Sequence, residues 1–540
     1  MKRILAVLVL ICVLCGCLAG FAACKSSKRP DNVIYVKSMY FGEWEDFNDD
    51  YTKFIENKFG VKFTDSKSGV SPAAYDFDNW TKELNSDLAG YNQGKLPDVF
   101  EADIDSLNFY DNYIKLAQKG RIKALPDSVL DENGEYPYLA KMLNNYSDLP
   151  YLKYKGKLYG IPIARNIEQT DVPFAPFTYI YRRDIAEKLG VAKENDEYTW
   201  SDFVKLLAAF KQNDFKKYGA LGDSEWAYPS IANFYKPASH CFAIEGNQVV
   251  NNYTTRGYLD GLNKTKELKQ YYLTQQGVYA GGENRVKDTY LKSQIGVFYE
   301  NITMANYKKI QKEMGGNGDK YAIMKVRGEE DGKYVLEEQE QWFSMSLISG
   351  QVSDKKLKSI LAIMNWLLSP EGTRMALYGI KGQDYTMDEA GNVTLLNKYG
   401  SLWYMSKGAY TDYAYNNGAR FLRYMVTLGN DLIDKDPLIQ NDKKTKEAYD
   451  TLQAWTSEMM DAYKHSELRI LGEDTQVKWM QTTYKQEYLS GMQNKAKSFV
   501  LDYAFYGNIK TESDYKKSFS NDTWKKVLDE INANYKPASN

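Results

Sequence analysis

The chain has 540 residues, with 69 basic and 71 acidic side chains, and its formal net charge is -2. This balance argues against a nucleic-acid partner and against charge-driven binding to an acidic membrane surface. The length is sufficient for two domains, each with its own hydrophobic core.

The N-terminus has the form of a secretory signal peptide. Lys2 and Arg3 give it a positive start, and residues 4–23 form an almost unbroken apolar run. Small residues precede Cys24, and a polar stretch follows it at once. This arrangement resembles a bacterial lipobox, in which the signal is removed and the cysteine carries the lipid. We therefore expect a signal peptide over residues 1–23, lipidation at Cys24 and a lipidated linker over residues 24–32.

Two alternatives remain open for this segment. Cys17 is a second candidate for lipidation, although it would leave the apolar residues 18–23 on the mature protein. The apolar run is also close to the minimum length of an uncleaved membrane anchor. In each case the rest of the chain faces outward. Only Cys241 lies beyond the leader, so the body has no disulfide framework and no cysteine metal cluster.

The first part of the body alternates between strand and helix patterns. An amphipathic helix is expected to end at Gly60, because glycine readily adopts the left-handed conformation that follows a helix. Alternation of this kind predicts an α/β lobe with a parallel sheet covered on both faces. The predicted elements are a strand at 33–36, a helix at 51–59, a strand at 61–63, a helix at 80–88 and a strand at 97–100.

The later segments continue the mixed pattern and become helical toward the C-terminus. Thr199 and Asp202 match a capping box. Ser369 is expected to cap a helix that has Pro370 at its first position. The predicted elements are an extended segment at 158–163, a strand-to-helix unit at 179–184, a helix through 203–210, a strand at 294–299, a helix at 357–368 and a last helix at 524–535.

Several short segments resemble, in their order and spacing, family 1 extracellular solute-binding proteins, which are the receptors of carbohydrate ABC importers. The longer lipoprotein subgroup of that family is similar in the segments from residue 368 onward. The matching segments are 156–162 (GKLYGIP), 181–184 (YRRD), 188–190 (KLG), 198–203 (YTWSDF), 368–372 (LSPEG), 378–385 (YGIKGQDY) and 505–507 (FYG) with Trp524.

The resemblance implies a type II periplasmic-binding-protein-like fold, with two α/β lobes joined by a hinge and a helical C-terminal extension. The chain would cross between the lobes near 160–162, 342–346 and 379–385. Lobe 1 would then hold residues 31–160 plus 343–384, and lobe 2 would hold 161–342 plus 385–540.

Ligands of open α/β sheets lie beyond the carboxyl ends of strands, so candidate contacts are sought after predicted strands and at the crossings. Sugars need aromatic faces for stacking and carboxylates, amides or guanidinium groups for their hydroxyls. The 45 Tyr and 10 Trp against 22 Phe suit such a wet site. The candidates are Glu43, Trp44, Glu101, Asp103, Arg165, Asn166, Trp226, Tyr228, Tyr299, Glu300, Asn301, Trp342, Asp384 and Tyr385.

Two readings of these residues stay open. Each aromatic ring suits the hydrophobic core as well as a binding surface. Arg165 can also fork a carboxylate or phosphate, so an acidic ligand is as admissible as a neutral one.

The resemblance and the candidate residues together predict capture of a carbohydrate, in particular an oligosaccharide, and its delivery to ABC permease subunits. We expect a monomer on the extracytoplasmic face of the membrane, held by its lipid, without cofactor, metal or nucleic acid. A secreted glycan-active hydrolase is one alternative, but only His240 and His465 are available and no nucleophile-elbow, zinc-protease or dinucleotide motif occurs. A sensory binding lipoprotein is the other.

Overall fold

The computed structural model describes the greater part of the chain beyond the leader. All structural statements below concern these residues. They are 30–37, 50–63, 86, 88–93, 96–103, 109–146, 148–163, 172–174, 177–213, 221–222, 241–271, 296–302, 320–338, 342, 344–396, 443–472, 474–480 and 482–537.

The first lobe is built on a four-stranded sheet whose order is β1 (Val36–Lys37), β2 (Val99–Asp103), β13 (Ser344–Ile348) and β3 (Gly160–Ile163). β1 and β2 are parallel, as the sequence predicts. The expectation of a wholly parallel sheet is wrong for β13, which is antiparallel to both β2 and β3. β13 enters from the other lobe, so it begins at the edge where its two neighbours end.

Helices cover this sheet. They are α2 (Asp50–Phe59), α4 (Phe109–Gln118), α5 (Pro137–Asn144), α12 (Asp354–Leu367) and α13 (Pro370–Tyr378). Ser369 accepts a hydrogen bond from the amide of Gly372, and Pro370 occupies the first helical position, which confirms the predicted cap of α13.

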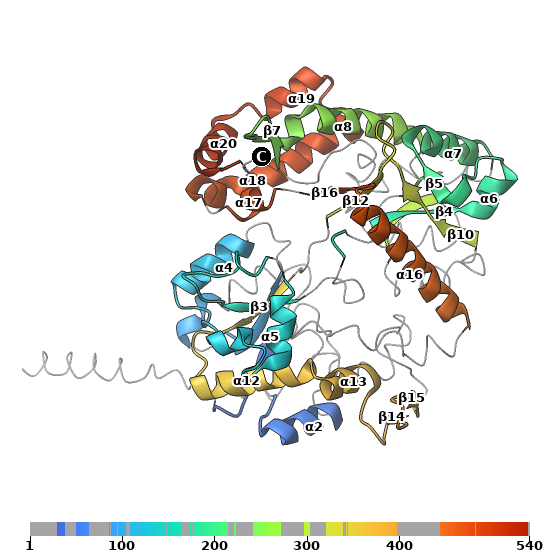
Figure 1. Ribbon diagram of the computed structural model, residues 1–540. Coiled ribbons are helices and arrows are strands. Elements are labelled where there is room, and N and C mark those ends of the chain that lie inside the picture. Colours follow the sequence, from blue (N-terminus) through green and yellow to red (C-terminus); the bar gives the residue numbers. More distant parts are fainter. Residues whose placement is uncertain are drawn as a thin grey trace, which may run out of the picture.

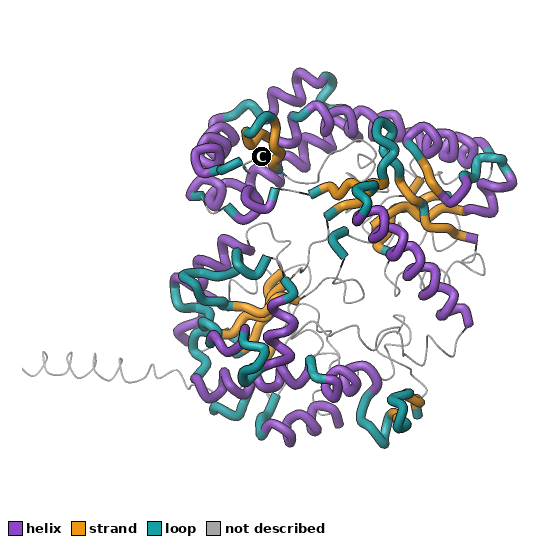
Figure 2. The backbone as a smooth tube through the Cα atoms, viewed as in Figure 1, coloured by secondary structure: helices purple, strands orange, loops and turns teal. Residues whose placement is uncertain are grey.

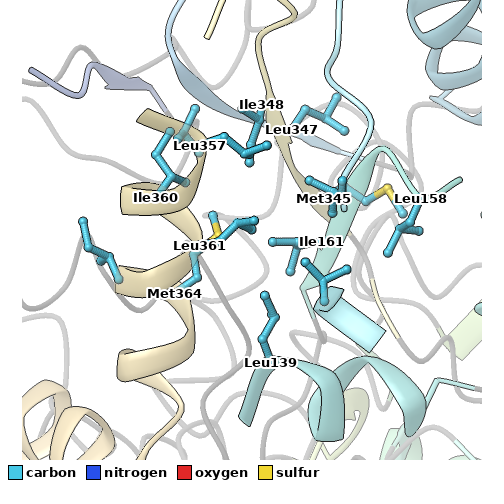
Figure 3. Packing of buried hydrophobic residues seen from close by; sticks show 14 of the residues in the cluster. Leu139, Leu158, Ile161, Met345, Leu347, Ile348, Leu357, Ile360, Leu361 and Met364 are labelled. Atoms are coloured by element: carbon cyan, nitrogen blue, oxygen red, sulfur yellow. The ribbon is translucent and has the colours of Figure 1, made fainter. Parts of the chain in front are cut away.

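The core of the first lobe lies between α12, α5 and the strands (Figure 3). Ile360, Leu361 and Met364 of α12 point from one stripe of the helix toward Met345 and Ile161. All five side chains are fully buried. The apolar stripe of α12 that the sequence predicts is therefore the face that packs on the sheet.

The second lobe contains another four-stranded sheet, in the order β10 (Tyr321–Ile323), β4 (Phe177–Arg182), β9 (Val297–Asn301) and β6 (Leu221–Gly222). Only β6 and β9 are parallel within it. Helices α6 (Arg183–Lys188), α7 (Trp200–Gln212) and α8 (Arg256–Leu268) belong to this lobe, with the hairpin β7 (Phe242–Glu245) and β8 (Gln248–Asn251). Thr199 accepts from the amide of Asp202, which confirms the capping box of α7.

The C-terminal region is mostly helical, as expected, and packs onto the second lobe (Figures 1 and 2). One strand interrupts it: β16 (Leu468–Leu471) pairs in parallel with β12 (Tyr334–Glu337). The remaining elements are β5 (Glu197–Tyr198), β11 (Lys325–Val326), β14 (Tyr385–Met387), β15 (Val393–Leu395), α16 (Lys443–Lys464), α17 (Thr475–Trp479), α18 (Thr483–Leu501), the π-helical turn Asp502–Tyr506, α19 (Glu512–Ser518) and α20 (Asp522–Asn534).

Buried apolar residues separate into distinct cores. One contains residues from 34–161 and 342–376 together with Trp479. A second is formed by residues of 179–335 and 471–531, and a third joins α16 to β4, β10 and β12. Among the described helices, none has both the length and the apolar character that a membrane crossing requires.

Candidate ligand site at the crossing between the lobes

Three strands of the first lobe meet at the edge that faces the crossing. Ser344, the first residue of β13, pairs with Asp103 at the end of β2 and with Ile163 at the end of β3. The carboxyl ends of β2 and β3 therefore lie at one edge, and Trp342 lies two residues before Ser344 in the chain. Asp103 was predicted here because it follows a predicted strand, and Trp342 because it precedes a crossing that the resemblance implied. The register brings Asp103 to this edge.

Glu101 supplies a buried carboxylate two residues before the end of β2. Its side chain is 3% exposed, and its Oε1 accepts a hydrogen bond of 2.5 Å from the hydroxyl of Ser344, which is fully buried. Ser346, opposite Glu101 in the register, is also buried. A carboxylate is stable away from water only with hydrogen-bond donors, and Ser344 supplies one. The interior of this edge is therefore polar. Sequence reasoning identified Glu101 and missed Ser344.

In the second lobe, the start of β4 and the end of β9 lie toward the crossing. Phe177, the first residue of β4, pairs with Asn301, and Thr178 pairs with Glu300. The ring of Tyr299 is 7% exposed and stacks on Phe177 at 5.9 Å between centroids. Tyr299 therefore has the core environment that the sequence left open for aromatic candidates, while the backbone of Glu300 and Asn301 lies at the facing edge.

Two segments that connect the lobes lie side by side. Phe174 forms an antiparallel bridge with Glu338, and the amide of Glu338 donates to the carbonyl of Leu471 at 2.8 Å. The first segment leads from β3 to β4, and the second leads from β12 to β13. The end of β16 is therefore also held beside the crossing.

The position of β16 beside the crossing brings Trp479 of the following helix, α17, into a stack of three aromatic rings. Trp479 stacks on Trp342 with centroids 5.9 Å apart and planes at 16°, and on Tyr151 at 6.1 Å and 9°. Trp342 and Trp479 are buried, whereas Tyr151 is exposed. Sequence reasoning missed Tyr151 and Trp479. No local feature of the sequence indicated Trp479, because its position depends on the pairing of the four-residue strand β16 with the distant β12.

Asp384 directly precedes β14, which begins at Tyr385 and lies near α13 (Figure 1). Asp384 Oδ2 accepts from the amide of Ile380 at 2.8 Å, and Tyr385 packs edge-on against Tyr378. Burial raises the pKa of Tyr385 and outweighs the opposing effect of Arg374. Both side chains thus have structural partners here, and their role as ligand contacts stays a prediction.

Other sequence candidates lie outside the described residues. They are Cys24, Glu43, Trp44, Arg165, Asn166, Trp226 and Tyr228. Within the part of the chain that the structure describes, no cluster of three or more His, Cys, Asp or Glu side chains has a geometry suited to a metal ion.

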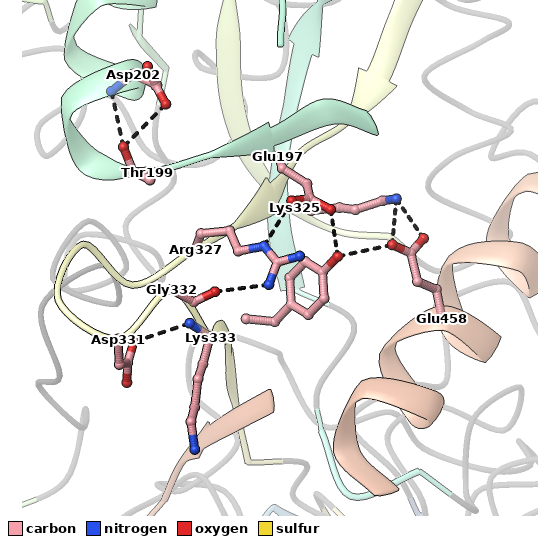
Figure 4. A network of polar contacts seen from close by, with 10 residues as sticks. Glu197, Thr199, Asp202, Lys325, Arg327, Asp331, Gly332, Lys333 and Glu458 are labelled. Carbon is pink, nitrogen blue, oxygen red and sulfur yellow. Dashed lines mark hydrogen bonds and ion pairs between the residues drawn. The ribbon is translucent and has the colours of Figure 1, made fainter. Parts of the chain in front are cut away.

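A polar network stiffens the second lobe around β12 (Figure 4). The hydroxyl of Tyr334 lies 2.7 Å from Oε1 of Glu197 and 3.1 Å from Oε1 of Glu458. Arg327 Nε donates to Glu197 Oε2 at 2.9 Å, and Lys325 Nζ donates to Glu458. Burial raises the pKa of Glu197, but hydrogen bonds from Arg327 and Tyr334 lower it by more. The pKa of Glu197 therefore lies below its usual value. The network joins β5, β11, β12 and α16.

Comparison with known proteins identifies the class of fold. No family model matches the chain. Lipoprotein LipO of Bacillus subtilis (strain 168) is 22% identical over 298 residues, which are 50% of this chain and 56% of LipO. The match thus spans little more than half of that relative.

Two solved structures are similar over nearly the whole chain. The alginate-binding protein AlgQ2 has a TM-score of 0.63 at 15% identity, covering 94% of this chain and 98% of AlgQ2. FusA of S. pneumoniae, an ABC-transporter substrate-binding protein solved as an EF-hand mutant with fructo-nystose, has a TM-score of 0.60 at 15% identity, covering 93% of this chain and 100% of FusA. The predicted fold class is confirmed: the chain has the two-lobe fold of solute-binding proteins with a helical C-terminal region.

Proposed function

We propose that the protein is an extracytoplasmic solute-binding lipoprotein that captures a carbohydrate between its lobes and delivers it to an ABC permease. The observation that carries this proposal is the buried Glu101 carboxylate with Ser344, at the sheet edge where the lobes are joined. Similarity of fold to AlgQ2 and FusA, over nearly their whole lengths, supports the ligand class.

The site chemistry suits a polyhydroxylated ligand. A carboxylate accepts hydrogen bonds from two neighbouring hydroxyl groups, and burial strengthens those bonds. Trp342, Glu300 and Asn301 belong to the two edges that face the crossing, so a ligand held there can contact both lobes. Ligand contacts that form only when the lobes are closed shift the equilibrium between the open and closed forms toward the closed form. The closed form is then the state that the permease recognises.

The lobe boundaries and the membrane anchor belong to the same proposal. For lobe 1 we keep the expected residues 31–160 plus 343–384 and add residues 161–163, because β3 pairs with β13 in the first sheet. Lobe 2 is assigned the remainder of the body. A lipid on Cys24 would keep the protein near the permease and raise its effective concentration there. No reaction is assigned, because the proposed site binds through hydrogen bonds and stacking alone.

A thermal-shift screen tests this function. The body of the protein, residues 25–540, is tested against alginate oligosaccharides, fructo-oligosaccharides, other neutral oligosaccharides and monosaccharides. Specific binding to the folded state raises the melting temperature with ligand concentration. The expected result is a shift with one glycan class and recovery of that glycan intact. Recovery of a cleaved glycan would replace this proposal with a hydrolase, and no shift with any saccharide would contradict the ligand class.

A further inference from the structure

Two residues of the short helix α17 are buried in different cores. Val477 is fully buried in the core of the second lobe, with residues of α18 and α20. Trp479 is buried in the core of the first lobe, with Trp342 and residues of β2 and β13. They are separated by one residue. α17 therefore lies on the boundary between the two lobes.

The second lobe holds α17 through its backbone as well as through Val477. Lys485 of α18 is buried, and its Nζ donates to the carbonyls of Val477 at 2.6 Å and Lys478 at 2.8 Å. The side chain of Gln476 accepts from the amide of Lys536 at 2.7 Å. These bonds fix the last turn of α17 and the direction in which Trp479 leaves it.

The first lobe holds the ring of Trp479 instead. Trp342 and Tyr151 both stack on the indole, and both rings lie within 16° of parallel to it. Trp342 lies two residues before the start of β13, and Tyr151 lies in the segment between α5 and β3. Rings stacked in this way keep their relative orientation, since offset-parallel contacts are favoured.

Trp479 also lies close to the connecting segments. Leu471, which ends β16, accepts from the amide of Glu338 on the segment that leads to Trp342. The chain then runs from Leu471 through α17 and returns to Trp342. A side chain that is fixed to both lobes near their connections restricts the directions in which one lobe can turn against the other.

We propose that Trp479 is the pivot residue of lobe movement, a positioning residue by which the C-terminal region sets the relative orientation of the lobes. This inference deepens the proposed function, because it concerns the closure on which ligand capture depends. It makes no use of the ligand, so it can be tested separately.

The test measures distances between the lobes by double electron–electron resonance. Spin labels are attached at Lys119→Cys, after α4, and at Lys205→Cys on α7, both exposed positions, in residues 25–540 without ligand. Cys241 is 2% exposed and is shielded from labelling. Trp479→Ala is expected to broaden the distance distribution, and Trp479→Phe is expected to restore most of its width because a ring again fills the stack.

Two further variants separate a pivot from general destabilisation. Trp524→Ala removes an indole of similar burial that lies in the second-lobe core alone, and it should leave the distribution unchanged. Tyr151→Ala removes one exposed side of the stack from a loop, and it should give partial broadening in a fully folded protein. An unaltered distribution in Trp479→Ala and Tyr151→Ala, or equal broadening in Trp524→Ala, would overturn the proposal whatever the ligand screen shows.

Discussion

The hydroxyl of Ser344 on β13 donates a 2.5 Å hydrogen bond to the carboxylate of Glu101 on β2, two strands that meet after 243 residues of chain. The bond is formed inside the sheet edge that faces the crossing, where both side chains are buried. β13 can supply this donor only because it runs antiparallel to β2 and begins at that edge. The hydrogen-bonding capacity of the proposed site therefore depends on the crossing itself.

Glu101→Gln should weaken ligand binding with little change in stability. The amide keeps the shape and an acceptor oxygen but loses the charge, which is worth about 1.5 kcal/mol or roughly tenfold in affinity for a charge-assisted bond. Calorimetric titration with the saccharide identified by the thermal-shift screen measures this loss. Glu56→Gln is the matched control, a buried carboxylate that bonds the amide of Phe63 in the same lobe. Equal affinities for the wild-type protein and Glu101→Gln would remove Glu101 from the site.

Lys356→Met should destabilise the first lobe strongly. Lys356 Nζ lies 3.1 Å from Asp98 Oδ2, and both residues are buried. Removing the cation takes the ion-pair partner away from the buried Asp98 carboxylate, to which the amide of Tyr35 also donates, at a cost of about 3–5 kcal/mol. Urea unfolding measures the loss. The double variant Asp98→Asn with Lys356→Met should recover part of it, and a single variant as stable as wild type would contradict the account.

Glu197→Gln should make the free energy of unfolding less dependent on pH in the acid range. The pKa of Glu197 is lowered in the folded protein, so its contribution to stability is fully present above the unfolded-state pKa of about 4.3 and is lost as pH falls through the lower folded-state pKa. The difference in unfolding free energy between wild type and variant should shrink as pH is lowered below that value. Denaturant titrations at several pH values measure it. A constant difference would show that Glu197 does not act through its charge.

Gly350→Ala should destabilise the protein by overpacking. A Cβ at this position would lie 2.1 Å from the backbone carbonyl oxygen of Gly120, which has little room to move. Such insertions typically cost about 1–3 kcal/mol. Gly60→Ala is the comparison: its φ is +65°, but no atom lies within 4 Å of an added Cβ, so only backbone strain is expected. Melting temperatures should rank wild type first, Gly60→Ala second and Gly350→Ala last.

Local features of this fold could be predicted from the sequence because their causes are local. The caps Thr199 and Ser369 lie within a few residues of the amides they bind, and the stripe of α12 follows helical periodicity. Glu101 was predicted to follow a strand, and the structure places it within β2, two residues before the end of that strand. The lobes and the hinge came from the resemblance to known binding proteins.

The remaining features depend on pairing between distant segments. Nothing in the sequence of β13 indicates that it pairs antiparallel with β2. Neither the mixed sheet nor the hydrogen bond from Ser344 was therefore predicted. β16 has four residues and pairs with β12, which lies more than a hundred residues earlier. Only this pairing brings Trp479 to Trp342, and a Trp after a short strand has no local feature that indicates it.

Small-angle X-ray scattering of residues 25–540, with and without the saccharide that gives the greatest thermal shift, tests the central claim most directly. If the lobes close over the ligand, the radius of gyration falls on saturation and the fall is smaller for Glu101→Gln at the same ligand concentration. An unchanged radius of gyration at saturation would contradict capture by closure of the two lobes.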